Sequence, residues 1–192
     1  MTPVETAPAE GGVAARLVQA GLSILAEQGA AGLTLRRIAA RAGVSHAAPA
    51  HHFAGLPGLL AAIAAQGFRM FHADLEALDR DAHSDPFDWL VCIEEVYLGF
   101  AARHPDLFRL MFSAPLPPDP DLEQAVRRTH AIHLAACTAV TGPERAEAML
   151  LAIWALTHGY AMLGLAQWND RFPATNASYR SLLRLLVRPD GA

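Results

Sequence analysis

The side chains best suited to chemistry lie close together near the N-terminus. Three arginines fall within residues 36–41 and three histidines within residues 46–52. A guanidinium group can donate two parallel hydrogen bonds to a phosphate or to the edge of a guanine base. Hydroxyl groups and imidazoles can also hydrogen-bond to phosphates. This segment is therefore suited to contact a polyanion.

The charge distribution favours such a contact only at this end of the chain. All fifteen basic residues are arginines, and the net charge is −4. Residues 1–60 hold four arginines against three glutamates, whereas the remaining 132 residues hold eleven arginines against sixteen acids. We expect any attraction to a polyanion to be local and modest.

The other reactive side chains are scattered. Cys92 and Cys137 show no Cys-x-x-Cys spacing, so we expect buried thiols and neither a disulfide framework nor a zinc site. His130 and His133 share a helical face, but no Asp or Glu completes a recognised metal-binding spacing. Nothing resembles a nucleophile elbow, an HExxH helix, a Walker loop or a dinucleotide fingerprint. We expect a protein that is not an enzyme and has no cofactor.

The composition predicts an all-α protein. Hydrophobic residues make up 53% of the chain and charged residues 18%, which excludes a disordered chain, and 39 alanines favour helices. Apolar periodicity, with glycine and proline as breaks, predicts helices over residues 12–28, 34–42, 46–53, 57–78, 86–103, 105–112, 119–139, 143–167 and 175–187. No apolar run is long enough to cross a membrane, and the first residues do not resemble a signal peptide. We therefore expect a cytoplasmic location.

The second and third predicted helices form a helix-turn-helix. Gly43 suits the sharp turn, Val44 can plug the core beside it, and Ser45 can cap the third helix, with Pro49 as its fourth residue. Thr34 can cap the second helix. Such a unit presents its second helix to the major groove of DNA, although the same link also joins helices that bind no DNA.

The segment Thr-Leu-Arg-Arg-Ile-Ala-Ala-Arg-Ala-Gly-Val-Ser at 34–45, followed by His52-Phe53 and Leu59-Leu60, resembles the DNA-binding domain of the TetR family of transcriptional regulators. The resemblance covers about Ala14 to Leu60. It implies a homodimer that reads a palindromic double-stranded DNA operator, with a tail and head over residues 1–56. Residues 57–192 would bind a small-molecule inducer and dimerise. The implied DNA contacts are Thr34, Arg36, Ser45, His46, Ala47, His51 and His52, with Arg36 as the candidate base reader.

Two positions depart from the family pattern. Ala50 stands where the family usually has a tyrosine, and Leu56 where it has a lysine. Both usual side chains normally contact phosphates, so their loss should weaken DNA affinity. The resemblance implies a regulator, in particular a repressor released by an inducer. The alternative is a helical ligand-binding dimer that has lost specific DNA binding.

The C-terminal part resembles the domain type named for its Trp-His-Gly signature, through Pro105–Phe112 and through Trp154 to Gly159. Its aromatic and polarisable side chains suggest a ligand pocket, with ordinary core packing as the alternative. The candidate pocket residues are Tyr97, Phe100, Phe108, Met111, Phe112, Trp154 and His158. The last two helices should form a four-helix dimer interface through Ala152, Ala155 and Gly159 and through Leu182, Leu183, Leu185 and Leu186.

Overall fold

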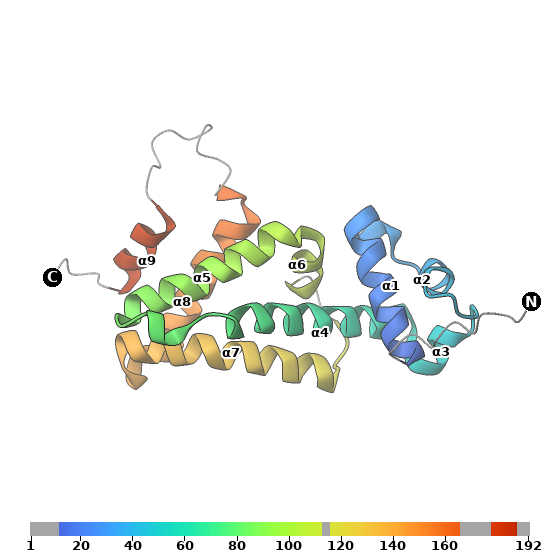
Figure 1. Cartoon of the computed structure of the whole chain (residues 1–192), viewed down its shortest axis with the longest axis horizontal. Helices are drawn as coiled ribbons and strands as arrows, with labels where there is room; N and C mark the ends of the chain where they lie inside the picture. Colours follow the sequence, from blue (N-terminus) through green and yellow to red (C-terminus); the bar gives the residue numbers. More distant parts are fainter. Residues whose placement is uncertain (1–11, 113–115, 166–177, 188–192) are drawn as a thin grey trace, which may run out of the picture.

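The computed structural model of the chain describes residues 12–112, 116–165 and 178–187, and all regular structure within these ranges is helical (Figure 1). This confirms the all-α prediction. The α-helices are α1 (Val13–Gln28), α2 (Leu35–Arg41), α3 (Ala48–His52), α4 (Gly55–Glu76), α5 (Pro86–Arg103), α6 (Pro105–Phe112), α7 (Pro120–Thr141), α8 (Pro143–Met162) and α9 (Tyr179–Val187). None of these helices is long and apolar enough to span a membrane.

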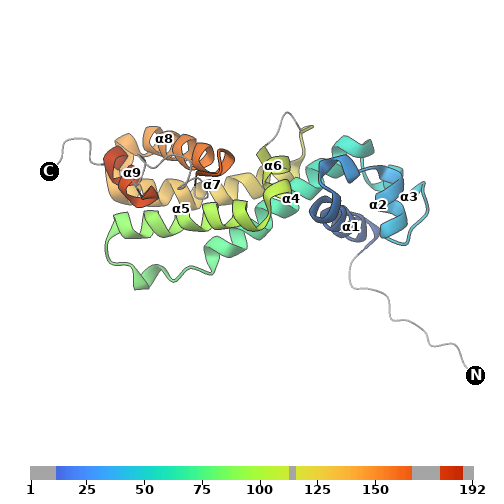
Figure 2. The same ribbon diagram turned by 90° about the horizontal axis from the view of Figure 1, so that it is seen from above.

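Helices α1 to α3 form a head at one end of an elongated molecule, and α4 runs from the head into the body (Figures 1 and 2). The head closes around Leu17, Ile24 and Ile38, which are almost entirely buried. Helix α4 contributes to this core, because Gly21 of α1 lets Ile63 approach closely: a Cβ atom on Gly21 would lie 2.4 Å from Ile63 Cδ1. The predicted boundary after residue 56 falls in the first turn of α4.

The turn of the predicted helix-turn-helix forms as expected. Gly43 follows α2 with a φ of +64°, a left-handed conformation that glycine adopts without strain. Val44 is partly buried against the core, and its N–H donates to the carbonyl of Ala39 (3.0 Å). Thr34 caps α2 as predicted, because its Oγ1 accepts a hydrogen bond from the N–H of Arg37 (3.3 Å).

The predicted cap of the third helix is wrong. Helix α3 begins at Ala48, its N-cap is Ala47, and no side chain caps it. The reason is Pro49, which has no N–H to donate and is therefore tolerated best in the first turn of a helix. The helix accordingly begins just before this proline, and Ser45 takes part in a turn through its carbonyl, which accepts from the N–H of Ala48 (3.0 Å).

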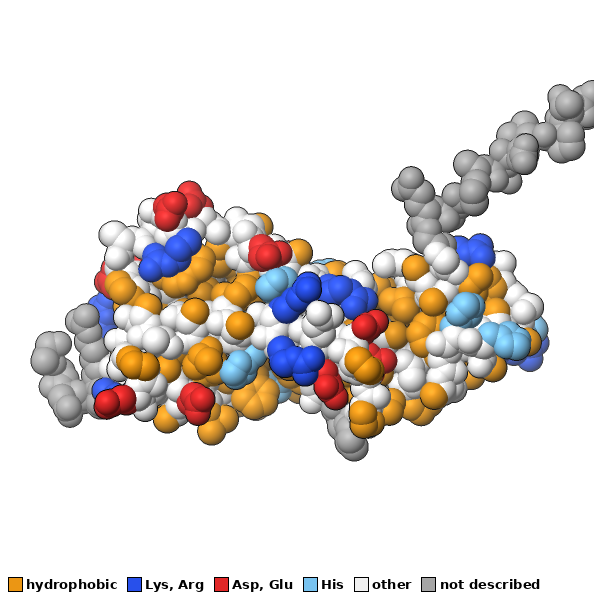
Figure 3. Space-filling view, turned by 90° about the horizontal axis from the view of Figure 1, so that it is seen from below, with side chains coloured by type: hydrophobic (Ala, Val, Ile, Leu, Met, Phe, Trp, Pro, Cys, Tyr) orange, Lys and Arg blue, Asp and Glu red, His pale blue; other side chains and the backbone are white. Residues whose placement is uncertain are grey.

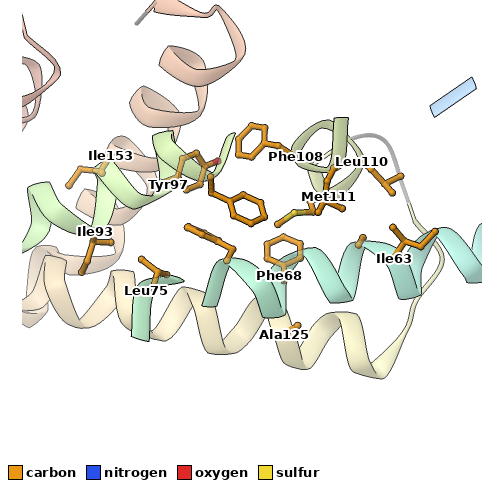
Figure 4. Packing of buried hydrophobic residues seen from close by; sticks show 14 of the residues in the cluster. Ile63, Phe68, Leu75, Ile93, Tyr97, Phe108, Leu110, Met111, Ala125 and Ile153 are labelled. Carbon is orange, nitrogen blue, oxygen red and sulfur yellow. The ribbon is translucent and has the colours of Figure 1, made fainter. Parts of the chain in front are cut away.

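The body is a bundle in which α7 lies alongside α4, and α5 and α8 pack against α7 (Figures 1 and 2). Figure 4 shows Phe68 of α4, Tyr97 of α5, and Phe108 and Met111 of α6 pointing toward one another in its core. Buried aromatic and aliphatic side chains of this kind supply most of the stability of such a bundle.

The end of α8 differs from the prediction. Helix α8 ends at Met162 rather than near residue 167, and Gly164 has a φ of +64° shortly after it. The predicted start of the last helix at Thr175 lies outside the described residues, and α9 is described from Tyr179. Cys137 is buried as predicted, whereas Cys92 is only half-buried.

Candidate nucleic-acid interface and ligand cavity

The head exposes every residue predicted to contact DNA. Thr34 and Arg36 lie at the start of α2, Ser45 to Ala47 lie in the turn, and His51 and His52 end α3. In Figure 3, histidine side chains gather at the outer end of the head, where α3 lies. Among the described residues, the head contains three histidines: His46, His51 and His52. The structure thus brings the predicted set to one end of the molecule.

The arginines of the head differ in how firmly they are held. Arg41 donates to both carboxylate oxygens of Glu27 at 2.7 Å, a bidentate pair, and Arg37 Nη1 donates to Gln28 Oε1 (3.3 Å). The side chain of Arg36 is exposed and has no hydrogen bond or ion pair with any residue that the structure describes. Its guanidinium is therefore the most available of the three, as a base reader would require.

The body contains a cavity of about 480 Å³. Its lining residues come from four helices, α4, α5, α7 and α8, together with the end of α6. They are Phe68, Phe71, Glu94, Tyr97, Phe112, Val126, Thr129, His130, His133, Glu147, Leu150, Leu151 and Trp154. Because His130, Leu151 and Trp154 are exposed, the cavity opens to the surface between α7 and α8.

Only part of the predicted pocket lines this cavity. The lining includes Tyr97, Phe112 and Trp154, but not Phe100, Phe108, Met111 or His158. Phe100, Phe108 and Met111 are buried core residues. The ring of His158 stacks on Phe108 (centroids 5.4 Å apart), and its Nδ1 lies 2.9 Å from the hydroxyl of Tyr97. These four residues therefore lie behind the cavity lining and not on it.

Burial keeps both partners of the hydrogen bond between Tyr97 and His158 in their neutral forms. Burial raises the pKa of the Tyr97 hydroxyl, and burial lowers the pKa of His158. Both effects favour the neutral side chains. The hydrogen bond between the hydroxyl and Nδ1 therefore joins two neutral groups, and it orients the Tyr97 ring at the cavity wall.

The inner end of the cavity holds a buried polar cluster. Glu94 is 2% exposed, and its Oε2 accepts a hydrogen bond from the Thr157 hydroxyl (2.7 Å), which also bonds to the hydroxyl of Tyr179. Glu94 Oε1 lies 3.8 Å from His133 Nε2. Burial raises the pKa of the Glu94 carboxyl, and His133, Thr157 and Tyr179 partly oppose this effect.

Only one of the two ring nitrogens of His133 has a hydrogen-bond partner among the described residues. Its Nδ1 lies 2.9 Å from the carbonyl of Thr129, and a carbonyl can only accept, so Nδ1 carries a proton. Its Nε2 is buried and has no hydrogen-bond partner. Unpartnered buried polar atoms are rare in folded proteins and call for an explanation. No group of three or more potential metal ligands occurs among the described residues.

Sequence reasoning missed most of the inner wall. Phe68 and Phe71 on α4 read as ordinary core, because periodicity shows that a face is buried but not what lies opposite it. Glu94 did carry a signal: it stands on the apolar stripe of α5, four residues after Leu90 and three before Tyr97. A lone acid on a buried stripe indicates a functional or paired group.

Two family models match the chain. Residues 17–63 match the model described as bacterial regulatory proteins of the tetR family, and residues 91–186 match a tetracyclin repressor-like C-terminal domain. The chain belongs to the TetR family. TetR-family proteins are DNA-binding transcriptional regulators rather than enzymes, which confirms the predicted class of function. The more specific Trp-His-Gly type stays a prediction.

Solved structures support the TetR fold over nearly the whole chain. A protein with unknown function from Rhodococcus sp. RHA1 is 28% identical, covers 96% of each chain and superposes with a TM-score of 0.74. The regulator SCO7222, a TetR from Streptomyces coelicolor, is 21% identical over 88% of this chain and 86% of its own, with a TM-score of 0.62. The multidrug binding protein EbrR, complexed with ethidium, is 22% identical over 91% and 98%, with a TM-score of 0.57. No curated protein matches the chain.

Proposed function

We propose that this TetR-family regulator is a homodimeric repressor, released from a palindromic operator when a small molecule enters the cavity of the body. The proposal depends mainly on one observation: α6 contacts α1 of the head and also ends at Phe112, which lines the cavity. A ligand can therefore act on the head through a helix that touches both. The DNA-contact residues proposed are those predicted from the sequence.

The charge of the head supports DNA binding. Residues 12–54 contain four arginines and a single acid, Glu27, which is already paired with Arg41. Arg36 and the three histidines extend this positive and polar surface toward α3. Such a surface supplies phosphate contacts around a recognition helix, and Arg36 can add a bidentate contact to guanine.

Helix α4 provides a second connection between cavity and head. It carries Phe68 at the cavity, and Ile63 one turn earlier packs against Gly21 of α1. Helices α4 and α6 also pack closely, because a Cβ atom on Gly67 would lie 2.6 Å from Met111 Sδ. A ligand that displaces Phe68 or Phe112 should thus move α4 and α6 together, change the separation of the two heads, and reduce the population that fits the operator.

The surface of α8 and α9 supports dimerisation. Leu151 (62% exposed), Trp154 (45%), Met162, Leu163 and Leu185 (68%) are large apolar residues left on the surface. Ala152 and Ala155 are also exposed beside them, as a close helix contact needs, whereas Leu183 packs inside the body. Apolar surface of this kind is typical of a subunit interface. A pair of heads is required because one short recognition helix reads too few base pairs.

Fluorescence polarisation with labelled duplexes tests the proposal. Fragments from upstream of the protein's own coding region should bind more tightly than a scrambled duplex of equal length, with an affinity that falls as salt rises. In transcription reactions with purified polymerase, the protein should lower transcript yield from a promoter that carries the bound sequence. Equal binding to both duplexes at low salt, or a higher transcript yield, would contradict the proposed repressor.

A further inference from the structure

We propose that the cavity takes a hydrophobic amine, bound as its cation, whose N–H groups donate to Glu94 and His133. This inference rests on the proposed function, since it specifies the ligand of the same cavity. Three observations carry it: the aromatic wall, the charge of the lining, and the two hydrogen-bond acceptors at the inner end.

The wall of the cavity selects an apolar body with aromatic or alkyl groups. Phe68, Phe71, Phe112 and Trp154 line it together with leucines of α8. Aromatic faces carry partial negative charge, so they attract a cation as well as an apolar ring. An aromatic cavity therefore tolerates a positively charged ligand better than an aliphatic one would.

The charged groups of the lining exclude an anionic ligand. Glu94 lies at the inner end and Glu147 lies on the exposed side of α8, and no arginine or lysine occurs among the described residues of the lining. A ligand carboxylate or phosphate would be desolvated next to Glu94 with no arginine or lysine of the described lining to receive it. A ligand cation would instead place an opposite charge next to Glu94.

The hydrogen-bonding atoms at the inner end can be bridged by one group that donates two hydrogen bonds. The bond from Nδ1 to the Thr129 carbonyl selects the neutral tautomer of His133 in which Nε2 is the acceptor, and Glu94 Oε1 is an acceptor beside it. The 3.8 Å between these atoms is too long for a direct hydrogen bond but lets one atom stand at hydrogen-bond distance from both. An ammonium group can donate to both acceptors at once, whereas a hydroxyl group has only one proton.

Glu94 is already held in place for this role. Its Oε2 is engaged by Thr157, whose hydroxyl also contacts Tyr179 of α9. Both groups fix the carboxyl so that Oε1 remains available toward His133. The arrangement is a preorganised acceptor pair at the end of an apolar cavity, and it fits the charged end of an amine.

Isothermal titration calorimetry with a matched set of probes tests the inference on the full chain. Naphthylmethylamine is the cationic probe, naphthylmethanol the neutral analogue, and naphthoate the anionic one. The amine should bind about tenfold or more tightly than the alcohol, because charge-assisted hydrogen bonds are the stronger ones, and naphthoate should not bind. The N,N,N-trimethyl form of the amine keeps the charge without N–H groups and should bind more weakly than the amine.

Replacing Glu94 tests whether this carboxyl group causes the preference for the amine over the alcohol. Glu94→Gln should remove the preference for the amine over the alcohol, because it removes the charge that the ammonium group contacts. Glu147→Gln removes the same charge at the exposed side and should retain most of the preference. Thermal unfolding followed by circular dichroism establishes whether both variants are folded. The probe series on the wild-type chain tests the amine inference even if neither variant folds.

The outcomes separate the two proposals. Equal binding of the amine and the alcohol, or tighter binding of naphthoate, would overturn the amine inference while leaving a ligand-binding cavity. Failure of all the probes to bind would overturn both the amine inference and the cavity on which the proposed induction depends. Tighter binding of the trimethyl form would show that charge, and not the pair of donated hydrogen bonds, selects the ligand, and would overturn the proposed donation to His133.

Discussion

The head and the body place their functional side chains in opposite ways. In the head, the candidate DNA contacts lie within 19 consecutive residues, 34–52, and all of them are exposed. In the body, the cavity gathers residues from Phe68 to Trp154, and its polar groups Glu94, Thr129 and His133 are buried. Exposed contacts can change without disturbing the fold, whereas buried ones are coupled to stability.

The comparison implies that the two regions can be disabled separately. The largest effect is expected from Ile38→Ala in the core of the head, where the side chain is fully buried. Such truncations cost about 2–5 kcal/mol of unfolding free energy. Differential scanning calorimetry should show a lower melting temperature for the head, and polarisation assays should show lost DNA binding, while the cavity still binds naphthylmethylamine.

Ile153→Ala is the matched control, since it deletes the same atoms from a fully buried site of the body. It should weaken binding in the cavity more than Ile38→Ala does. If Ile38→Ala abolishes amine binding as completely as DNA binding, head and body unfold as one unit and the distinction between them fails.

The same contrast explains what the sequence could predict. Local signals were sufficient for several helix ends: Gly29 ends α1, Thr34 caps α2, and Pro105 and Pro143 begin helices. The assignment of Ser45 as a cap failed because two local preferences competed, and the missing N–H of Pro49 decided where α3 begins. Which of two competing local preferences prevails depends on the contacts of the whole folded chain.

The cavity could not be predicted from local signals. Phe108 and Phe112 lie on the same short helix and read alike in the sequence, yet Phe112 lines the cavity while Phe108 packs beside His158. Which of them faces the cavity depends on how α6 docks against α4 and α5, which is a tertiary property. Likewise, the position of His133 beside His130 on one helical face did not show that its Nδ1 bonds the carbonyl of Thr129.

Arg36→Ala should produce the next largest effect, on DNA affinity alone. Loss of a bidentate contact to guanine costs about 1–3 kcal/mol and relaxes preference at one position of the operator. The melting temperature should stay unchanged, because Arg36 has no partner among the described residues. Polarisation with operator variants and thermal unfolding together measure the two expectations.

Arg41→Ala provides the matched comparison, because Arg41 is engaged by Glu27 on the same surface. It should change operator preference less than Arg36→Ala does. A larger loss of preference in Arg41→Ala would reverse the assignment of the base reader.

Thr34→Ala should have a smaller effect that reaches both stability and DNA binding. The side chain of Thr34 caps α2, and loss of an N-cap costs about 1 kcal/mol. Thr34→Ser keeps the capping oxygen and should behave like the wild type in thermal unfolding. If the alanine variant unfolds at the wild-type temperature, the cap contributes nothing to the head and Thr34 acts only toward DNA.

The smallest effect concerns the body and depends on pH. Because burial raises the pKa of Glu94 above its ordinary value of 4.5, the folded state holds this proton more tightly than the unfolded state. The contribution of Glu94 to stability is therefore fully present below about pH 4.5, and it is lost as pH rises through the pKa of Glu94 in the folded state. Glu94→Gln has no proton to lose, so its melting temperature relative to wild type should increase from acid to neutral pH and then level off.

Glu147→Gln is the control, because it changes the net charge by the same amount at an exposed site. A constant difference between Glu94→Gln and wild type from pH 4 to pH 8 would mean that Glu94 is ionised and satisfied in the folded chain, which would leave the cavity less in need of a cation.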